Sequence, residues 1–171
     1  MSISRRHLAT AAALAAAALG GWWLSGGGPG REAAPQVDYT LLNGQRLNIG
    51  QLKGQVVLVN FWATSCATCV AEIPQISATF EKFKDQGYQT LAVAMHYDAP
   101  ANVARFAESR HLPFGVVIDN TGEIARRFGR VQVTPTTFLI NKRGEIVKRY
   151  VGQPDFAALQ TRVAQLLAEP G

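Results

Sequence analysis

The chain has 171 residues, of which 47% are hydrophobic and 17% are charged, a composition typical of globular rather than disordered proteins. Its formal net charge is +5, and the twin arginine at positions 5 and 6 supplies two of these charges. The other basic residues are scattered or occur in pairs, which favours a solvated surface over a patch for nucleic acid. We therefore expect one domain with a single core and no nucleic-acid partner.

The first 30 residues differ in composition from the rest of the chain. After the twin arginine, residues 8–24 form a stretch without Asp, Glu, Lys or Arg, at the short end of the roughly 17–25 residues that cross a bilayer. The twin arginine resembles an export signal, although Leu8 stands where phenylalanine is more usual. We expect this segment to export the domain, either as a retained inner-membrane anchor or as a cleaved signal. The glycine-rich residues that follow predict a flexible linker.

From residue 37 onward, strand and helix patterns alternate. We expect, in chain order, a short hairpin within 37–55, a buried strand at 56–63, a helix from Ala67 to about Lys84, a strand at 88–96, a helix at 98–111 capped at its start, a strand at 114–119, a short helix at 121–129, a strand hairpin at 133–152 and a terminal helix at 154–169. This order implies an α/β domain whose central mixed β-sheet is flanked by helices.

The only two cysteines, Cys66 and Cys69, lie in "FWATSCATCVAEIP", where a buried strand ends and a helix begins. Open α/β sheets place their sites at this end of the strands. The free amides and dipole of the helix start stabilise a thiolate, so we expect Cys66 to be the attacking thiol. Cys69 follows on the same face and is predicted to be the more buried, resolving thiol.

Other roles for the two thiols are less consistent with the sequence. A structural zinc site needs four ligands, and outside the leader only His96 and His111 are available besides the cysteines. A structural disulfide remains an alternative, but a bond closing so short a loop contributes less chain-entropy stabilisation than a long one. The pattern therefore favours a redox-active pair and predicts no metal site.

The motifs "FWATSCATC" and "VTPTTFLI" together resemble the thioredoxin fold. The segment "CATCVAEIP" and the inserted residues 98–119 resemble the TlpA/ResA-like branch of bacterial thiol–disulfide oxidoreductases, within the redoxin-like part of the thioredoxin superfamily. The resemblance covers about residues 37–168, which we take as the domain. It implies a thioredoxin fold with the TlpA-type αβ insertion and an N-terminal β-hairpin.

The resemblance also implies roles for individual residues. Cys66 corresponds to the family's nucleophile and Cys69 to its partner in a redox-active disulfide. Pro135 matches the family's cis-proline beside the disulfide, and Thr134 would offer backbone hydrogen bonds to an extended substrate segment. Glu72 would accept or relay the proton of the resolving thiol, with its pKa raised if it is buried. The alternatives are a strand-edge proline and an early-helix acid favoured by the helix dipole.

Two positions depart from thioredoxin itself. Ser65 stands where thioredoxins usually have tryptophan, so we expect a smaller and more polar rim. We place Ser65 and Trp62 on the substrate-binding rim, with core packing as the alternative for Trp62. Asn60 replaces the buried aspartate of thioredoxin, so we expect that particular proton route to be absent.

The leading hypothesis is an extracytoplasmic enzyme that exchanges electrons with protein thiols and disulfides through Cys66 and Cys69, without a cofactor. The resemblance suggests a reductant serving cytochrome c maturation or a related pathway and supplied by a membrane electron donor, but the residues between the cysteines do not fix the direction. One alternative is a copper-binding module that uses both thiols and His96 as soft ligands. Another is a peroxide reductase.

Overall fold

The computed structural model describes residues 31–171, and the leader predicted at residues 1–30 lies outside them. Residues Glu32–Gly171 form one compact unit. Within the described part of the chain, none of the helices is long and apolar enough to cross a membrane. The predicted anchor and linker therefore stay predictions.

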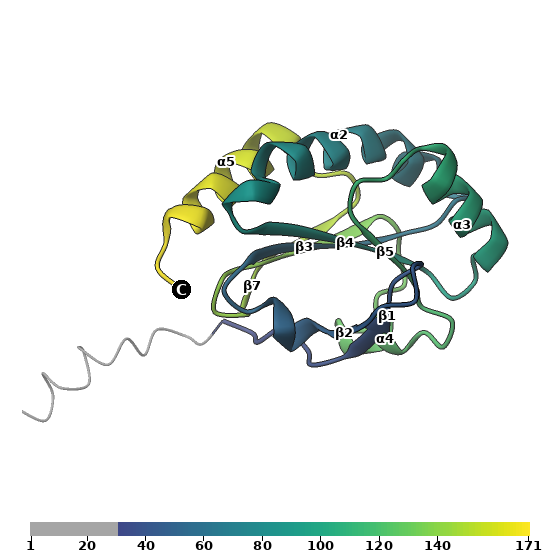
Figure 1. The fold of residues 1–171 in the computed structure, drawn as a ribbon, viewed down its shortest axis with the longest axis horizontal. Helices are drawn as coiled ribbons and strands as arrows, with labels where there is room; N and C mark the ends of the chain where they lie inside the picture. Colours follow the sequence, from purple (N-terminus) through teal and green to yellow (C-terminus); the bar gives the residue numbers. More distant parts are fainter. Residues whose placement is uncertain (1–30) are drawn as a thin grey trace, which may run out of the picture. The chain divides into compact units, whose positions relative to one another are not determined.

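A five-stranded mixed sheet forms the centre of the domain. Its strand order is β5-β4-β3-β6-β7 (Figure 1). Strands β3, β4 and β5 run parallel. On the other side of β3, β6 is antiparallel to β3 and β7 is antiparallel to β6. The bounds are β3 Val56–Trp62, β4 Tyr88–Ala94, β5 Gly115–Ile118, β6 Thr136–Ile140 and β7 Ile146–Val151, with a separate N-terminal hairpin of β1 Asp38–Thr40 and β2 Arg46–Asn48. The predicted mixed sheet and N-terminal hairpin are both confirmed.

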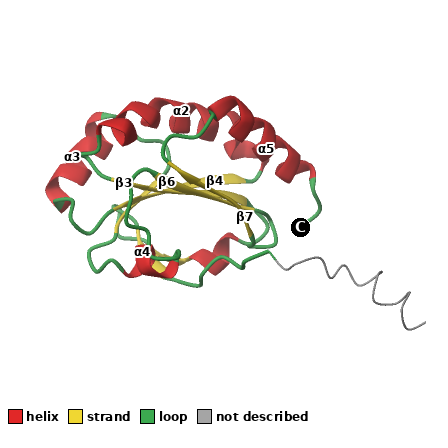
Figure 2. Ribbon diagram, turned by 180° about the vertical axis from the view of Figure 1, so that it is seen from behind, coloured by secondary structure: helices red, strands yellow, loops and turns green. Residues whose placement is uncertain are grey.

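Helices cover both faces of this sheet. Figures 1 and 2 show α2, α3 and α5 on one face, and α4 with the β1–β2 hairpin on the other. The bounds are α2 Ala67–Phe83, α3 Pro100–Ser109, α4 Glu123–Arg127 and α5 Phe156–Ala168. Helix α2 continues through Pro74. The α/β architecture predicted from the alternating elements is therefore the observed one.

Strand β3 is buried on both faces, as its continuous apolar run predicts. Val57, Val59 and Phe61 belong to the core on the α4 side of the sheet. Leu58 and Trp62 belong to the core beneath α2 and α5. Because side chains alternate along a strand, Asn60 must point toward α2 together with Leu58 and Trp62. A polar side chain is thereby placed below the helix that carries the cysteines.

The start of α3 differs from the prediction. The sequence favours Asp98 as a cap, but the residue that caps α3 is Ala99, which has no side-chain hydrogen bond to the helix. Pro100 at the first helical position leaves one fewer backbone N–H in need of a partner. Asp98 is free to bond elsewhere, and its carboxylate binds the loop that precedes the cysteines.

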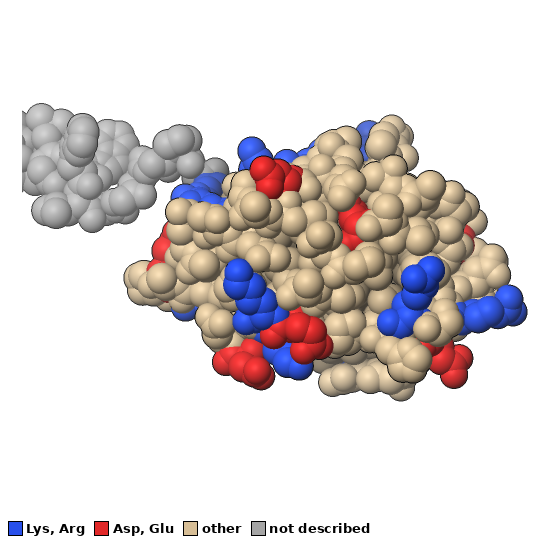
Figure 3. Space-filling view, turned by 90° about the horizontal axis from the view of Figure 1, so that it is seen from above, with Lys and Arg blue, Asp and Glu red and all other residues tan. Residues whose placement is uncertain are grey.

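The surface charges are mixed on the face that Figure 3 shows. Lys and Arg side chains lie there in small groups among Asp and Glu, without one large area of either sign. On this face, the arrangement agrees with the solvated surface expected from the scattered basic residues.

Candidate active site

The two cysteines lie where α2 begins. Cys66 has an extended backbone and caps the helix, and its Sγ accepts a hydrogen bond from the backbone N–H of Cys69 at 3.2 Å. The two sulfurs are joined in a disulfide, with their Cα atoms 5.2 Å apart. Cys66 is partly exposed, whereas Cys69 is completely buried. An incoming disulfide or thiol therefore reaches the sulfur of Cys66 first.

The loop between β3 and Cys66 is held by a carboxylate from the end of the neighbouring strand. Asp98 accepts from the backbone N–H of Thr64 at 2.5 Å and from its hydroxyl at 2.6 Å. Asp98 is only 7% exposed, and hydrogen bonds to a charged acceptor are among the stronger ones in proteins. The position of the loop is thus fixed two residues before Cys66. No local pattern predicts this contact, because Asp98 also suits the start of a helix.

The loop before β6 lies at the same end of the sheet as the cysteine loop. Strands β3 and β6 are antiparallel with Phe61 opposite Thr136, so the residues before Thr136 lie beside the end of β3. The Thr134–Pro135 peptide bond is cis, as the resemblance implied. Pro135 is buried and its carbonyl accepts from the N–H of Gly152 at 2.8 Å. The strand register therefore places Pro135 at the end of β3, where the cysteine loop begins.

Tyr97 contacts the loop that contains the cis-proline. Its hydroxyl lies 3.4 Å from the hydroxyl of Thr134, and its side chain is 54% exposed. Its neighbour Asp98 holds the cysteine loop, so one short segment after β4 contacts both loops of the site. Sequence reasoning did not single out Tyr97, because an aromatic residue after a strand is most simply interpreted as core.

Beneath the cysteines lies a buried polar cluster of Glu72, Asn60 and Thr137, all at most 1% exposed. The amide nitrogen of Asn60 donates to Glu72 Oε1 and to the hydroxyl of Thr137, both at 2.9 Å. Three polar atoms in or beside this cluster, Asn60 Oδ1, Glu72 Oε2 and Trp62 Nε1, have no protein partner. Glu72 follows Cys69 by three residues on α2, and therefore shares its face of the helix.

Burial determines the protonation of Glu72. Removal from water raises the pKa of this carboxyl from 4.5 to about 7, and the hydrogen bond from Asn60 opposes that rise. The condition set in the sequence analysis is met, since Glu72 is buried and its pKa is raised, while its part in proton transfer stays a proposal. The sequence suggested only that Asn60 lacks the carboxylate found at this position in thioredoxin. In the structure, Asn60 also binds and orients the carboxyl of Glu72 on α2.

The two predicted rim residues have different positions. Ser65 is exposed next to Cys66, where a small polar rim was expected. Trp62 is 0% exposed and packs its ring against Phe106 of α3, with their centroids 5.2 Å apart. The prediction that Trp62 contacts substrate is therefore wrong for this structure, and the alternative of core packing holds.

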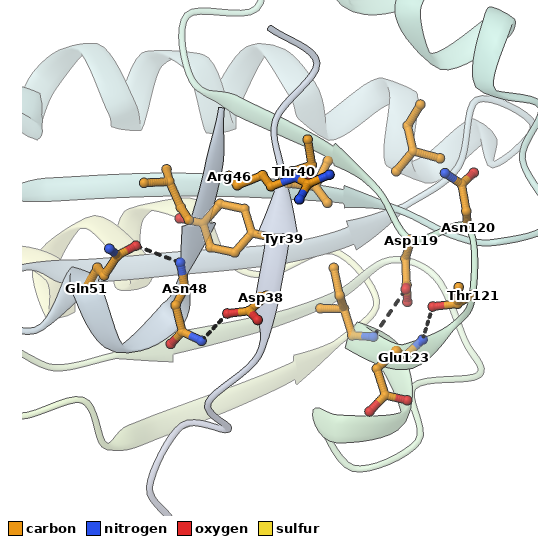
Figure 4. A pocket seen from close by; sticks show the side chains of 14 residues that line it. Asp38, Tyr39, Thr40, Arg46, Asn48, Gln51, Asp119, Asn120, Thr121 and Glu123 are labelled. Carbon is orange, nitrogen blue, oxygen red and sulfur yellow. Dashed lines mark hydrogen bonds between the residues drawn. The ribbon is translucent and has the colours of Figure 1, made fainter. Parts of the chain in front are cut away.

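Away from the cysteines, a cavity of about 700 Å³ lies between the β1–β2 hairpin and α4 (Figure 4). Three of its polar side chains are engaged within the protein: Asn48 donates to Asp38, and Asp119 accepts from two backbone N–H groups of α4. Neither cysteine lines it. The first contact joins β2 to β1 within the hairpin, and the second holds the start of α4 to the chain that follows β5.

Comparison with known proteins agrees with this geometry. The model of the Redoxin family matches residues 29–163, which is most of the chain. The chain belongs to the Redoxin family. Two curated relatives are thiol-disulfide oxidoreductases named ResA. The one from Bacillus thuringiensis subsp. konkukian is 33% identical over 124 residues, with 72% of this chain and 70% of the relative covered. The one from Bacillus subtilis is 36% identical over 110 residues, with 64% and 60% covered.

Solved structures support the same fold. A thiol:disulfide interchange protein of the thioredoxin family from Chlorobium tepidum TLS matches with a TM-score of 0.75 and 25% identity, covering 82% of this chain and 99% of that one. StoA from Bacillus subtilis matches with a TM-score of 0.65 and 25% identity, covering 75% and 96%. The predicted thioredoxin fold and the TlpA/ResA-like resemblance are confirmed, and with them the assignment as a thiol–disulfide oxidoreductase.

Within residues 31–171, no group of three or more His, Cys, Asp and Glu side chains is arranged to hold a metal ion. The copper-binding alternative, with His96 as third ligand, gains no support from the described part of the chain.

Proposed function

We propose that this domain reduces disulfides in other proteins outside the cytoplasm, with Cys66 as nucleophile and Cys69 as resolving thiol. The observation that carries the proposal is the asymmetry of the pair. Cys66 is the accessible sulfur and receives a backbone N–H at 3.2 Å, whereas Cys69 is fully buried one turn further along the helix. Backbone amides at a helix start stabilise negative charge on sulfur, and the thiolate is the form that attacks.

The reaction then proceeds in two balanced exchanges. The Cys66 thiolate attacks one sulfur of the substrate disulfide, which forms a mixed disulfide and releases the other substrate sulfur as a thiolate. Cys69, after losing its proton, attacks the sulfur of Cys66 and releases the second substrate thiolate. The substrate gains two electrons and two protons, and the domain is left with the Cys66–Cys69 disulfide. A separate electron donor must reduce that disulfide before the next cycle.

Three further residues belong to the proposal. The backbone of Thr134 would pair with an extended substrate segment beside the buried Pro135, in the manner of an added strand. Glu72 would take the proton that Cys69 loses, since both are buried on the same face of α2. Ser65 would contact the substrate from the exposed rim beside Cys66.

The test is a Cys69→Ala variant of the full chain expressed in its native host. Without the resolving thiol, mixed disulfides at Cys66 should accumulate, and mass spectrometry of the captured proteins identifies substrates and donor. A Cys66→Ala variant is the matched control and should capture far fewer proteins. Equal capture by the two variants would contradict the assignment of roles.

The direction of electron flow needs its own measurement. The reduction potential of the Cys66–Cys69 couple, measured against a glutathione buffer, should lie nearer to about −270 mV than to about −120 mV, the limits known for Cys-x-x-Cys proteins. A value more oxidising than about −150 mV would assign the domain to disulfide formation instead.

Export and anchoring by residues 8–24 are also part of the proposal, as are a membrane electron donor and a role in cytochrome c maturation. The support is the basic start followed by an uncharged apolar stretch. Fractionation of the host separates the outcomes: carbonate-resistant membrane association supports an anchor, and soluble extracytoplasmic protein supports a cleaved signal. Protein confined to the cytoplasm would contradict export.

A further inference from the structure

A groove of about 440 Å³ lies next to the active site, on the side of the sheet that carries α4. One wall is His96 after β4, and the opposite wall is formed by Arg126, Arg130 and Gln132, on α4 and the chain that follows it. We call these four residues the basic groove. None of them belongs to the buried polar cluster or to the proposed reductase mechanism, and only His96 entered an alternative function, as a copper ligand.

Both walls of the basic groove lead to the loop that contains the cis-proline. Gln132 precedes Thr134 by two residues in the chain. On the other wall, His96 is followed by Tyr97, whose hydroxyl lies 3.4 Å from that of Thr134. The strand register places Thr134 beside the end of β3, where the cysteine loop starts. A substrate segment that pairs with Thr134 would therefore extend naturally into the groove.

The groove is lined by two arginines and by no carboxylate. The guanidinium of Arg126 already binds Glu123 and the carbonyl of Thr121. Arg130 is exposed, and within residues 31–171 its side chain makes no ion pair or hydrogen bond. One cation beside the site is therefore available for a ligand from outside.

The backbone of Arg130 has an unusual conformation. Arg130 has a φ of +56°, in the left-handed region that favours glycine, directly after Gly129 at +76°. The turn is held by the N–H of Arg130 bonding to the carbonyl of Arg126 at 3.0 Å, and by that of Val131 bonding to Ala125 at 2.9 Å. A long charged side chain thus occupies a position whose backbone would suit glycine better. Strained positions of this kind gather at functional sites.

Exposed apolar side chains border the same loop. Val133 is 58% exposed and Tyr97 is 54% exposed, and in the chain they directly follow Gln132 and His96 of the groove lining. A partner bound there meets an apolar contact at the loop and a positive charge further along. Carboxylates match the planar guanidinium of arginine through paired hydrogen bonds.

We propose that the basic groove selects substrate proteins that carry an acidic side chain close to the disulfide, with Arg130 as the residue that determines this preference. The inference rests on the proposed reductase function and names the class of substrate for the same site. The acidic side chain binds Arg130 while the neighbouring backbone pairs with Thr134 and its disulfide faces Cys66. The charge accelerates the productive encounter and slows release of the partner.

The test uses the full chain, reduced beforehand, and two synthetic peptides that each carry one internal disulfide. The peptides differ only in glutamates or glutamines flanking the cysteines, and the second-order rate constant of their reduction is followed by stopped flow. Wild type should reduce the acidic peptide about fivefold faster than the neutral one at low salt, and ~0.5 M NaCl should remove most of that difference.

Variants assign the effect to the groove. Arg130→Gln should lose the preference and keep the wild-type rate with the neutral peptide, and Arg130→Gly, which suits the backbone, should behave in the same way. Arg105→Gln removes an equal charge from α3 on the opposite face of the sheet, and it should retain the preference (Figure 1). Arg130→Glu should prefer a lysine-flanked peptide.

The outcomes separate the two proposals. Equal rates with acidic and neutral peptides would overturn the role of the groove and leave the reductase function intact. A preference that survives in Arg130→Gln and Arg130→Gly would equally overturn it. If the reduced wild type reduces neither peptide, the proposed function fails, and the groove proposal fails with it.

Discussion

The buried carboxyl of Glu72 should make the stability of the domain depend on pH. The perturbation we consider is Glu72→Gln, which keeps the shape of the side chain and an oxygen that accepts from Asn60, but removes the titrating group. In the oxidised domain both cysteines are in the disulfide and do not titrate. The comparison of wild type with Glu72→Gln therefore isolates one carboxyl.

The direction follows from proton binding. Below about pH 4.5, Glu72 is protonated in both the folded and the unfolded chain. Between pH 4.5 and about 7, the folded chain holds a proton that the unfolded chain has lost, so the free energy of unfolding falls as the pH rises. Above about pH 7, the folded domain carries the buried charge, and the loss of stability is complete.

The magnitude comes from the raised pKa. At ~1.4 kcal/mol per pKa unit, a rise from 4.5 to about 7 corresponds to about 3.5 kcal/mol at most. Relaxation around the buried charge reduces this figure, and we expect about 2 kcal/mol. Relative to wild type, Glu72→Gln should therefore gain about 2 kcal/mol of unfolding free energy between pH 5 and pH 8.

The assay is urea unfolding of the oxidised proteins at several pH values between about 5 and 8. Glu81→Gln is the matched control, because Glu81 lies on the same helix but is exposed and paired with Lys84. That control should follow wild type within about 0.5 kcal/mol at every pH. Parallel curves for wild type and Glu72→Gln would show that burial does not raise the pKa of Glu72, and would refute the reasoning.

Three further changes test the contacts around the site. Asn60→Asp places a second carboxyl against the buried one, so the midpoint of the pH-dependent loss should move above pH 7; an unchanged midpoint would show that the two groups do not interact. Asp98→Ala removes both acceptors of Thr64 and should cost about 2–4 kcal/mol in urea unfolding, with faster amide exchange at Thr64; normal protection there would mean that another contact holds the loop. Asp119→Ala removes a buried acceptor of two backbone N–H groups at the start of α4 and should cost about 1–2 kcal/mol. Asp155, which accepts from two N–H groups at the start of α5, is exposed, so Asp155→Ala should cost less; equal losses would show that burial adds nothing.

Local signals in the sequence were enough to predict the elements of the domain. The apolar run at 56–63 precedes Cys66, the helical spacing from Ala67 includes Cys69, and both became the expected strand and helix. Asn43–Gly44 and Gly144 lie in the turns of the two predicted hairpins, where residues of these types favour a turn. These signals act over a few residues, so propensity and periodicity capture them.

Contacts between distant segments could not be predicted in the same way. The sequence separates Asn60 from Thr137 by 77 residues and Thr64 from Asp98 by 34, and no local pattern connects either pair. Asp98 shows why: its position before Pro100 favours a cap, and only the folded arrangement offers Thr64 as a better partner. The prediction for Trp62 was wrong for a related reason, because the exposure of this side chain depends on whether α3 covers it.

In the proposed mechanism, the buried cluster must meet two requirements: Cys66 must carry negative charge, and Cys69 must lose a proton before it attacks. A carboxylate ionised at all relevant pH values would oppose negative charge on the neighbouring sulfur, and a carboxyl protonated at all of them would accept no proton. With a pKa of about 7, Glu72 is close to the balance between the two forms at neutral pH. In the mechanism we propose, it would accept a proton when Cys69 becomes a nucleophile and return it when the disulfide is reduced again. Asn60, by donating to Glu72 and lowering its pKa from what burial alone would impose, holds the carboxyl in that range.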